Sequence, residues 1–302
     1  SGASPPNQAV AELWTGAGVP IGAWSTGGSL NTGRTSMGGA GIETSALAYG
    51  GGPSKTAVTE SYNGTNWTEV NDLNTARSQV GSAGTDNTAA LAFGGEATPG
   101  NTTLTELWNG SNWTEVNDLN TDKRGGANAG TTTSGLVAGG LGPSVNMSQT
   151  EIWNGTNWTE VNDLNTARRD MMGFGLNNTS ALAAGGSAPT KNETELWNGT
   201  NWTEVNNLNT ARNAAASSTL GNATSSGLVM GGENPGSSDL SVTEEWNGNS
   251  WTEVNDLNTG RNQLGGAGNT TAALAFGGGP VPVRVSTEEW SSSSNTVKTL
   301  TD

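Results

Sequence analysis

The residues best suited to acid–base chemistry are glutamates that recur in pairs nine positions apart, such as Glu106 and Glu115. The equivalent pairs are Glu60/Glu69, Glu151/Glu160, Glu195/Glu204 and Glu244/Glu253. A glycosidase needs only two carboxyl groups, so each pair is a candidate. An active site, however, is one asymmetric arrangement, whereas a residue that a repeated fold requires appears in every repeat. The recurrence therefore favours a structural role for these glutamates.

Other kinds of catalytic or metal site lack their residues. The chain has no His and no Cys, which excludes Ser–His and Cys–His nucleophiles and the usual zinc sites. Asp72, Asp118, Asp163 and Asp256 occupy equivalent positions and offer oxygen ligands for a cation. Asn207 interrupts that series, and no calcium-loop motif is present. We therefore predict that the chain is not an enzyme and that it needs no metal and no cofactor.

Arginine also recurs at about one position in every repeat. The six residues are Arg34, Arg77, Arg124, Arg168, Arg212 and Arg261. Two roles are open for them: a ring of side chains that binds an anion or a substrate, or a structural contact needed in each repeat. The regular recurrence favours the structural role.

Composition and charge exclude several classes of partner. The chain has 302 residues, a formal net charge of −15, 46 Gly and 12 Trp. Nucleic acids and anionic membrane surfaces are poor partners, because binding to either requires clustered Lys and Arg. Apolar runs such as 89–93 are too short to cross a bilayer. The 12 Trp supply enough buried area to support a core despite a hydrophobic content of only 32%.

The elements that position these residues repeat about every 45 residues. The segment Trp108 to Leu119 returns, with small changes, at 62–73, 153–164, 197–208 and 246–257. All 12 Trp fall on two positions of the repeat, and the second of them is occupied by Trp24, Trp67, Trp113, Trp158, Trp202 and Trp251. An apolar run that ends in Gly-Gly lies between successive copies, as at 91–95.

Each repeat is expected to form four short antiparallel strands. The first is the small-residue stretch after the arginine, such as 79–83, and the second is the apolar run before Gly-Gly. The third ends at the first aromatic residue, and the fourth runs Trp-Thr-Glu-Val from the second Trp. Asn109-Gly110 predicts a tight hairpin between the last two strands, in which both residues take positive φ.

Such a unit cannot bury its own faces and must stack on like units, which a closed ring achieves. The sequence therefore predicts one all-β domain over 1–302, a six-bladed β-propeller of four-stranded antiparallel blades. The repeat units are 35–77, 78–124, 125–168, 169–212, 213–261 and 262–302, with an extra half unit at 8–34. The small-residue strands are expected near the ring axis and the Trp rows between adjacent blades.

The order of arginine, apolar strand, Gly-Gly, aromatic residue and Trp resembles the kelch repeat, and it covers nearly the whole chain. The text NGTNWTEVNDLNTAR at 63–77 is also similar to kelch-like repeat proteins of marine bacteriophages and bacteria. The resemblance implies that each arginine binds loop carbonyls or a neighbouring carboxylate where blades meet. It also implies that strands from both termini complete one blade. A partial seventh blade, or a half unit packed outside the ring, is the alternative for the surplus text around Glu12–Trp14 and Glu288–Leu300.

Function is expected where the repeats differ from each other. The variable segments follow Gly-Gly, at 52–58, 96–104, 141–149, 187–192, 233–242 and 279–286. They are expected on the same face as the arginines, and loops on a rigid scaffold commonly carry recognition. The candidate binding face comprises the six arginines together with Lys55, Asn101, Asn146, Lys191, Asn234 and Arg284.

We expect a binding protein of a virion or an extracellular surface that contacts a carbohydrate or a protein through this face. The alternatives are a purely structural virion decoration or spacer domain without a ligand and, third, a polysaccharide-acting enzyme. The oligomeric state stays open.

Overall fold

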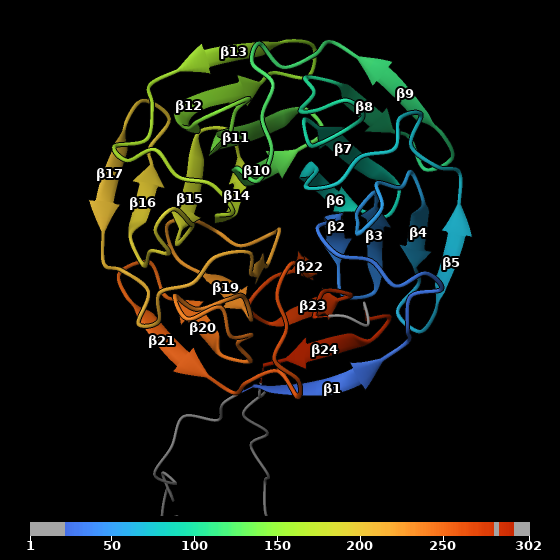
Figure 1. The fold of residues 1–302 in the computed structure, drawn as a ribbon. Helices are drawn as coiled ribbons and strands as arrows, with labels where there is room; N and C mark the ends of the chain where they lie inside the picture. The colour runs from blue at the N-terminus through green and yellow to red at the C-terminus, as the bar shows by residue number, and fades with distance from the viewer. Residues whose placement is uncertain (1–21, 281–283, 293–302) are drawn as a thin grey trace, which may run out of the picture.

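The computed structural model describes residues 22–280 and 284–292, and it is a ring of six four-stranded antiparallel sheets (Figure 1). No helix is present in these ranges. The predicted all-β, six-bladed propeller is therefore confirmed. None of the described residues forms a helix long and apolar enough to span a membrane.

Each of the first five blades is formed by one continuous stretch of chain, with its first strand near the axis and its fourth at the rim (Figure 1). Blade one is β2 (Gly38–Ile42), β3 (Ser45–Tyr49), β4 (Thr59–Tyr62) and β5 (Trp67–Val70). Blade two is β6 (Gly81–Asp86), β7 (Ala89–Phe93), β8 (Thr105–Trp108) and β9 (Trp113–Val116). Blade three is β10 (Ala127–Thr131), β11 (Ser134–Leu141), β12 (Asn146–Trp153) and β13 (Trp158–Val161).

Blades four and five follow the same order. Blade four is β14 (Met172–Asn177), β15 (Ser180–Ala184), β16 (Thr194–Trp197) and β17 (Trp202–Val205). Blade five is β18 (Ala216–Ser217), β19 (Gly227–Met230), β20 (Thr243–Trp246) and β21 (Trp251–Val254). Its first strand is only two residues long, because the chain leaves the sheet after Ser217 and returns at Gly227.

The sixth blade closes the ring with strands from both ends of the chain. Strands β22 (Gly265–Gly268), β23 (Ala272–Phe276) and β24 (Thr287–Ser291) come from the last repeat, and β1 (Ala23–Gly27) adds the outer strand. Trp24 pairs with Trp290 in the register that Trp113 and Trp108 adopt within blade two. Closure by both termini is therefore confirmed, whereas the surplus text at Glu12–Trp14 and 293–300 lies outside the described residues.

The Trp rows fill the space between adjacent blades, as the sequence predicts. Trp113 of blade two is buried and packs edge-on against Tyr49 of blade one, with ring centroids 4.9 Å apart. Its indole Nε1 donates a hydrogen bond to Thr59 Oγ1 of blade one at 3.1 Å. Equivalent hydrogen bonds join the five remaining pairs of neighbouring blades: Trp24 to Thr243, Trp67 to Thr287, Trp158 to Thr105, Trp202 to Thr150 and Trp251 to Thr194. Each joint therefore combines apolar burial with a satisfied indole N–H.

The turn between the third and fourth strands differs from the predicted two-residue hairpin. Trp108 and Trp113 are paired, so four residues form the loop. Only Gly110 has positive φ, at 90°. Asn109 acts instead through its side chain, because its Oδ1 accepts hydrogen bonds from the backbone N–H groups of Ser111 and Asn112, both at 2.9 Å. Asparagine is therefore required here as an Asx-turn acceptor rather than for a left-handed backbone.

Candidate binding face

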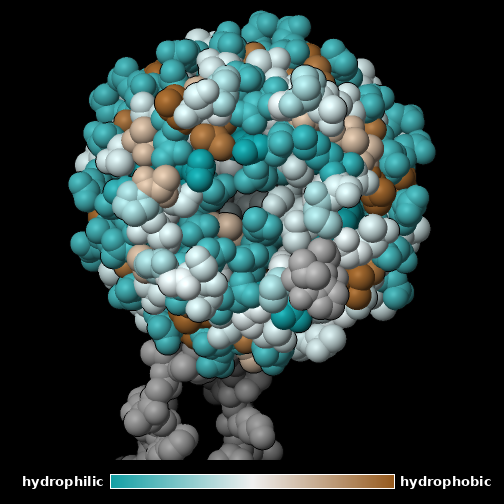
Figure 2. Space-filling model, viewed as in Figure 1, coloured by the Kyte–Doolittle hydropathy of each residue, from teal (hydrophilic) through white to brown (hydrophobic). Residues whose placement is uncertain are grey.

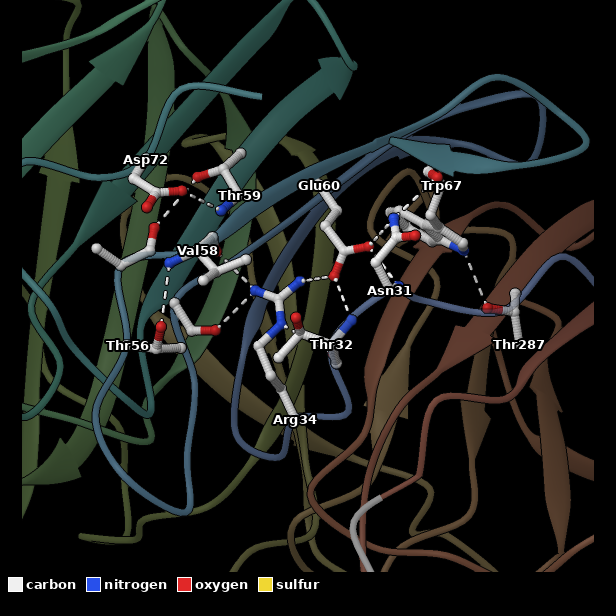
Figure 3. A network of polar contacts seen from close by, with 12 residues as sticks. Asn31, Thr32, Arg34, Thr56, Val58, Thr59, Glu60, Trp67, Asp72 and Thr287 are labelled. Atoms are coloured by element: carbon white, nitrogen blue, oxygen red, sulfur yellow. Dashed lines mark hydrogen bonds and ion pairs between the residues drawn. The ribbon is translucent and has the colours of Figure 1, made fainter. Parts of the chain in front are cut away.

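The recurring cation forms a buried network at each joint, shown for blade one in Figure 3. Arg34 Nη1 donates to the carbonyls of Gly50 at 3.0 Å and Val58 at 2.6 Å. Arg34 Nη2 pairs with Glu60 Oε1 at 2.9 Å. The other oxygen of Glu60 accepts hydrogen bonds from the backbone N–H and side-chain amide of Asn31. Arginine and carboxylate are thus both paired and hydrogen-bonded, as buried charges must be.

The same arrangement recurs around the ring. The equivalent ion pairs are Arg77–Glu106, Arg168–Glu195, Arg212–Glu244 and Arg261–Glu288, with N–O distances of 2.6–2.8 Å. Burial lowers the pKa of Arg77 and Arg212, although each paired carboxylate counteracts this effect. Placing these arginines on a binding face is a prediction that needs correction: Arg34, Arg77, Arg168, Arg212 and Arg261 are at most 1% exposed. A ligand at the surface cannot reach them.

At the third joint, the sequence-based prediction named the wrong residue as the recurring cation. Lys123, not Arg124, occupies the buried position: it is 1% exposed and lies 3.1 Å from Glu151. Arg124 follows it and pairs at the surface with Glu96. Spacing would have identified the lysine, because each buried cation lies four residues after a buried leucine, as Arg77 follows Leu73 and Lys123 follows Leu119.

The recurring acidic residues also separate into two groups. Glu106 and Glu115 are cross-strand partners, but Glu106 is buried against Arg77 whereas Glu115 is exposed on the outer strand. Asp72 Oδ1 accepts a hydrogen bond from the backbone N–H of Thr59 at 3.1 Å. Asn207 accepts the equivalent bond with its own Oδ1, which explains why an amide can replace the carboxylate. Within the described ranges, no group of three or more Asp and Glu is placed to hold a metal ion.

The two ends of the ring differ in composition. We call the mouth face the end formed by the loops between second and third strands and the loops between blades; bridges such as Ser78–Glu96 and Arg124–Leu141 join these loops. The hairpin face is the opposite end, formed by turns such as 87–88 and 109–112. Among the described residues, every Lys or Arg outside the buried joints lies on the mouth face. These residues are Lys55, Arg124, Arg169, Lys191 and Arg284.

Three of the mouth-face loops are joined through Glu96. Its carboxylate lies 3.1 Å from Lys55 Nζ of blade one and also pairs with Arg124, which precedes blade three. Lys55 also donates to the carbonyl of Ala97 at 2.7 Å. Burial alone would raise the pKa of Glu96, but the hydrogen bond from Lys55 and the charges of Arg124 and Lys55 outweigh it, so the pKa lies below its ordinary value.

This lowered pKa predicts a pH-dependent contribution to stability. A carboxyl group whose pKa is lower in the folded chain stabilises the fold above its unfolded pKa, and that contribution is lost as pH falls through the folded pKa. The variant Glu96→Gln should lower the free energy of unfolding by about 1 kcal/mol or less at pH 7, as for other partly exposed ion pairs. The difference from the unmodified chain should shrink as pH falls below 4.

Urea titrations at several pH values measure this difference. Glu115→Gln, on the exposed outer strand, is the matched control and should differ little from the unmodified chain throughout. A Glu96→Gln effect that persists unchanged at pH 3 would contradict the assignment.

The remaining predicted site residues also lie on the mouth face. Asn101 Nδ2 donates to the carbonyl of Leu141 at 2.8 Å, and Asn146 is paired with Leu141 at the start of β12. Lys191 Nζ lies 2.9 Å from Glu193. Asn234 closes its own loop by accepting from the N–H groups of Gly236 and Ser238. Arg284 Nε donates to the carbonyl of Gly279 at 3.3 Å.

A ring of residues at the centre of the mouth face was not predicted from the sequence. The residue two positions after each buried cation has positive φ between 50° and 63°: Ser36, Gln79, Gly125, Asp170, Ala214 and Gln263. Backbone hydrogen bonds link neighbours in this ring, as from Gln79 to Ser36 at 2.7 Å and from Gln263 to Ala214 at 2.6 Å. The fixed spacing of two residues from the buried cation was the available signal, but the varied residue types at this position concealed it.

Fold and joints together define a six-bladed β-propeller with a buried ion pair at every joint, five formed by arginine and one by lysine, and one varied loop face. Comparison with known protein families found no matching family model, and comparison with curated proteins found no match.

Proposed function

We propose that this propeller is a non-enzymatic recognition module that binds a carbohydrate or a protein through its mouth face. The observation that carries the proposal is the distribution of cations. Six of them, one at each joint, are buried in copied ion pairs, whereas the five accessible ones lie on mouth-face loops that differ between blades. A rigid repeated frame that displays varied loops is a common arrangement for recognition.

The proposal extends to the repeat type and to location. The buried cation, the Gly-Gly pair and the two aromatic positions support a kelch-type blade. The similarity of the repeat text to kelch-like phage and bacterial proteins supports a place on a virion or an extracellular surface. The formal net charge of −15 disfavours nucleic acid as the ligand.

Charge reversal on each face tests the proposal. Lys191→Glu combined with Arg284→Glu alters the mouth face, and Glu43→Lys combined with Asp86→Lys makes the same number of changes on the hairpin face. Binding is measured on a glycan array and on intact cells at physiological salt. The mouth-face variant should bind at least tenfold more weakly, and the hairpin-face variant should bind within about twofold of the unmodified chain, since distant surface charges change affinity little.

Equal losses in both variants would contradict the proposal. So would an absence of binding to every glycan and every cell surface, which would favour a structural decoration or spacer.

A further inference from the structure

The ring of left-handed residues surrounds a cavity at the axis of the mouth face. This cavity has a volume of about 110 Å³ and is lined by Gln79, Asp170, Gln263 and Asn128, among others. A second cavity of about 100 Å³ continues along the axis and shares lining residues with the first, including Asn128 and Met171. Figure 2 shows the hollow at the centre of the ring, bordered mostly by hydrophilic residues.

The choice of residues in this ring points to a ligand. A left-handed backbone favours glycine, yet only Gly125 of the six is a glycine. Ser36, Gln79, Asp170 and Gln263 keep polar side chains despite the backbone strain, and all four line the axial cavity. The hydrogen bonds that close the ring use backbone atoms and would form equally well with glycine. Strained residues that the fold does not require are characteristic of binding sites.

The ring is interrupted beside its single glycine. The backbone bonds run from Asp170 through Ala214, Gln263 and Ser36 to Gln79, whereas Gly125 is linked only by a long bond of 3.4 Å from Met171 N–H to its carbonyl. A side chain at position 125 would meet the Asp170 carboxylate, because an added Cβ would lie 2.8 Å from Asp170 Oδ1. Because residue 125 is a glycine, no side chain fills the space beside Asp170, and the wall of the cavity has a gap there.

The groups around this gap include both hydrogen-bond donors and hydrogen-bond acceptors. Asn128 Oδ1 is buried and accepts no hydrogen bond. This oxygen has no surface open to the cavity, so a ligand there cannot reach it. The carboxylate of Asp170 accepts from Gln79 Nε2 at 3.0 Å and from Ser187 Oγ at 2.8 Å, and its Oδ2 lies 3.3 Å from Arg169 Nε. Its four lone-pair sites leave room for a further donor. The groups that line the cavity and can bind a ligand are the Asp170 carboxylate and the side-chain amides of Gln79, Gln263 and Asn128.

The shape of the cavity and its charge narrow the class of ligand. Met37, Met171 and Leu264 are buried and form an apolar part of the wall. At the other end of the axis, Thr219 of blade five reaches the carbonyl of Gly41 in blade one at 3.3 Å, and Leu220 N–H reaches the carbonyl of Gly268 in blade six at 2.9 Å. This segment narrows the channel, so an extended polymer would enter by its end. Because Asp170 is paired with Arg169, the site carries no net charge and suits a neutral ligand.

We infer that the axial cavity binds the terminal residue of a neutral glycan. Sugar hydroxyls donate to Asp170, and they accept from the side-chain amides of Gln79, Gln263 and Asn128. The C–H face of the sugar packs against Met37 and Met171, whose side chains adapt to irregular shapes. This assignment deepens the proposed function, on which it rests, by naming the ligand class and the part of the ligand that is bound.

The variant Asn128→Leu tests this assignment without threatening the fold. It removes the side-chain amide together with the orphaned acceptor and keeps the same branched shape, so the melting temperature should stay equal or rise. The probe is a panel of neutral methyl glycosides, with binding measured by saturation-transfer NMR and by competition with array binding. The unmodified chain should bind at least one glycoside, and Asn128→Leu should weaken that binding at least tenfold.

Two further variants complete the test. Asp170→Asn, within the cavity, should also weaken glycoside binding, whereas Asp163→Asn, which lies outside the cavity, should not. Unchanged glycoside binding in Asn128→Leu and Asp170→Asn overturns the axial site, as does binding of the unmodified chain to a protein partner but to no glycoside. Both outcomes leave the proposed recognition function intact, because that function depends on the charge-reversal comparison of the two faces.

Discussion

Replacing Arg77 by methionine is expected to lower the free energy of unfolding by about 3–5 kcal/mol. The change removes the partner of Glu106, with which Arg77 forms an ion pair at 2.7 Å, in a site where both side chains are at most 2% exposed. It also leaves the carbonyls of Gly94 and Leu104 without the hydrogen bonds that Arg77 Nη1 donates at 3.0 and 2.7 Å. An unpaired buried carboxylate is among the costliest single defects in a folded protein.

Two further variants separate the charge from its geometry. Arg77→Lys reproduces the natural choice at Lys123, so it should cost less than methionine. Arg77→Met combined with Glu106→Leu should recover part of the loss, because a buried ion pair replaced as a whole is far less costly than one that is broken. Lys191→Met, at a partly exposed ion pair, is the control and should cost about 1 kcal/mol or less.

Urea unfolding monitored by Trp fluorescence measures all four variants. An Arg77→Met chain as stable as the Lys191→Met chain would show that the joints are not held by their ion pairs.

Removing the outer strand of the sixth blade is expected to open the ring. A chain that starts at residue 28 lacks β1, and with it Trp24, whose ring lies 5.4 Å from that of Trp290 and whose Nε1 bonds Thr243 of blade five. The loss of this one buried Trp should cost about 3–5 kcal/mol, and the freed edge of β24 adds unpaired backbone groups. We expect a much lower melting temperature and association between chains through the open edge.

Complementation makes this test specific. A peptide spanning 22–27 should restore the stability of the shortened chain by adding back the strand, and the same peptide with Trp24→Ala should not. A chain that starts at residue 22 keeps β1 and serves as the length control. Equal melting temperatures for the chains starting at 22 and at 28 would contradict closure by β1.

Much of the propeller fold was predictable because each part of a blade follows a local sequence pattern that recurs in every repeat. The two Trp positions, the Gly-Gly pair and the strand lengths fix a four-stranded blade, and the surplus half unit at the N-terminus predicts closure. The Gly-Gly pair illustrates why: Gly94 and Gly95 have φ of 58° and 96°, and a Cβ at Gly94 would lie 2.6 Å from the carbonyl of Lys123. A position that only glycine can occupy is recognisable in the sequence from the glycine itself.

The mouth face was less predictable because its structure depends on contacts between repeats. Arg34 and Arg77 are buried because the neighbouring blade packs against them. The sequence of a single repeat does not specify this packing. The register of Lys123 and Arg124 is ambiguous until Glu151 and Glu96 are placed in space. The left-handed backbone at Gln79 is set by a hydrogen bond to Ser36 of the preceding blade. The only local signal is the fixed spacing of two residues from the buried cation, and the residue type at this position does not reveal it.

The central claim is that the mouth face binds a ligand and that the hairpin face does not. Hydroxyl-radical footprinting of the chain, alone and with its strongest array ligand, tests this claim most directly because it reports on both faces in one experiment. The account predicts protection of mouth-face residues, including Met37 and Met171 at the axis, and unchanged labelling of hairpin turns such as 109–112 and 154–157. Protection of the hairpin turns with an unprotected mouth face would contradict it.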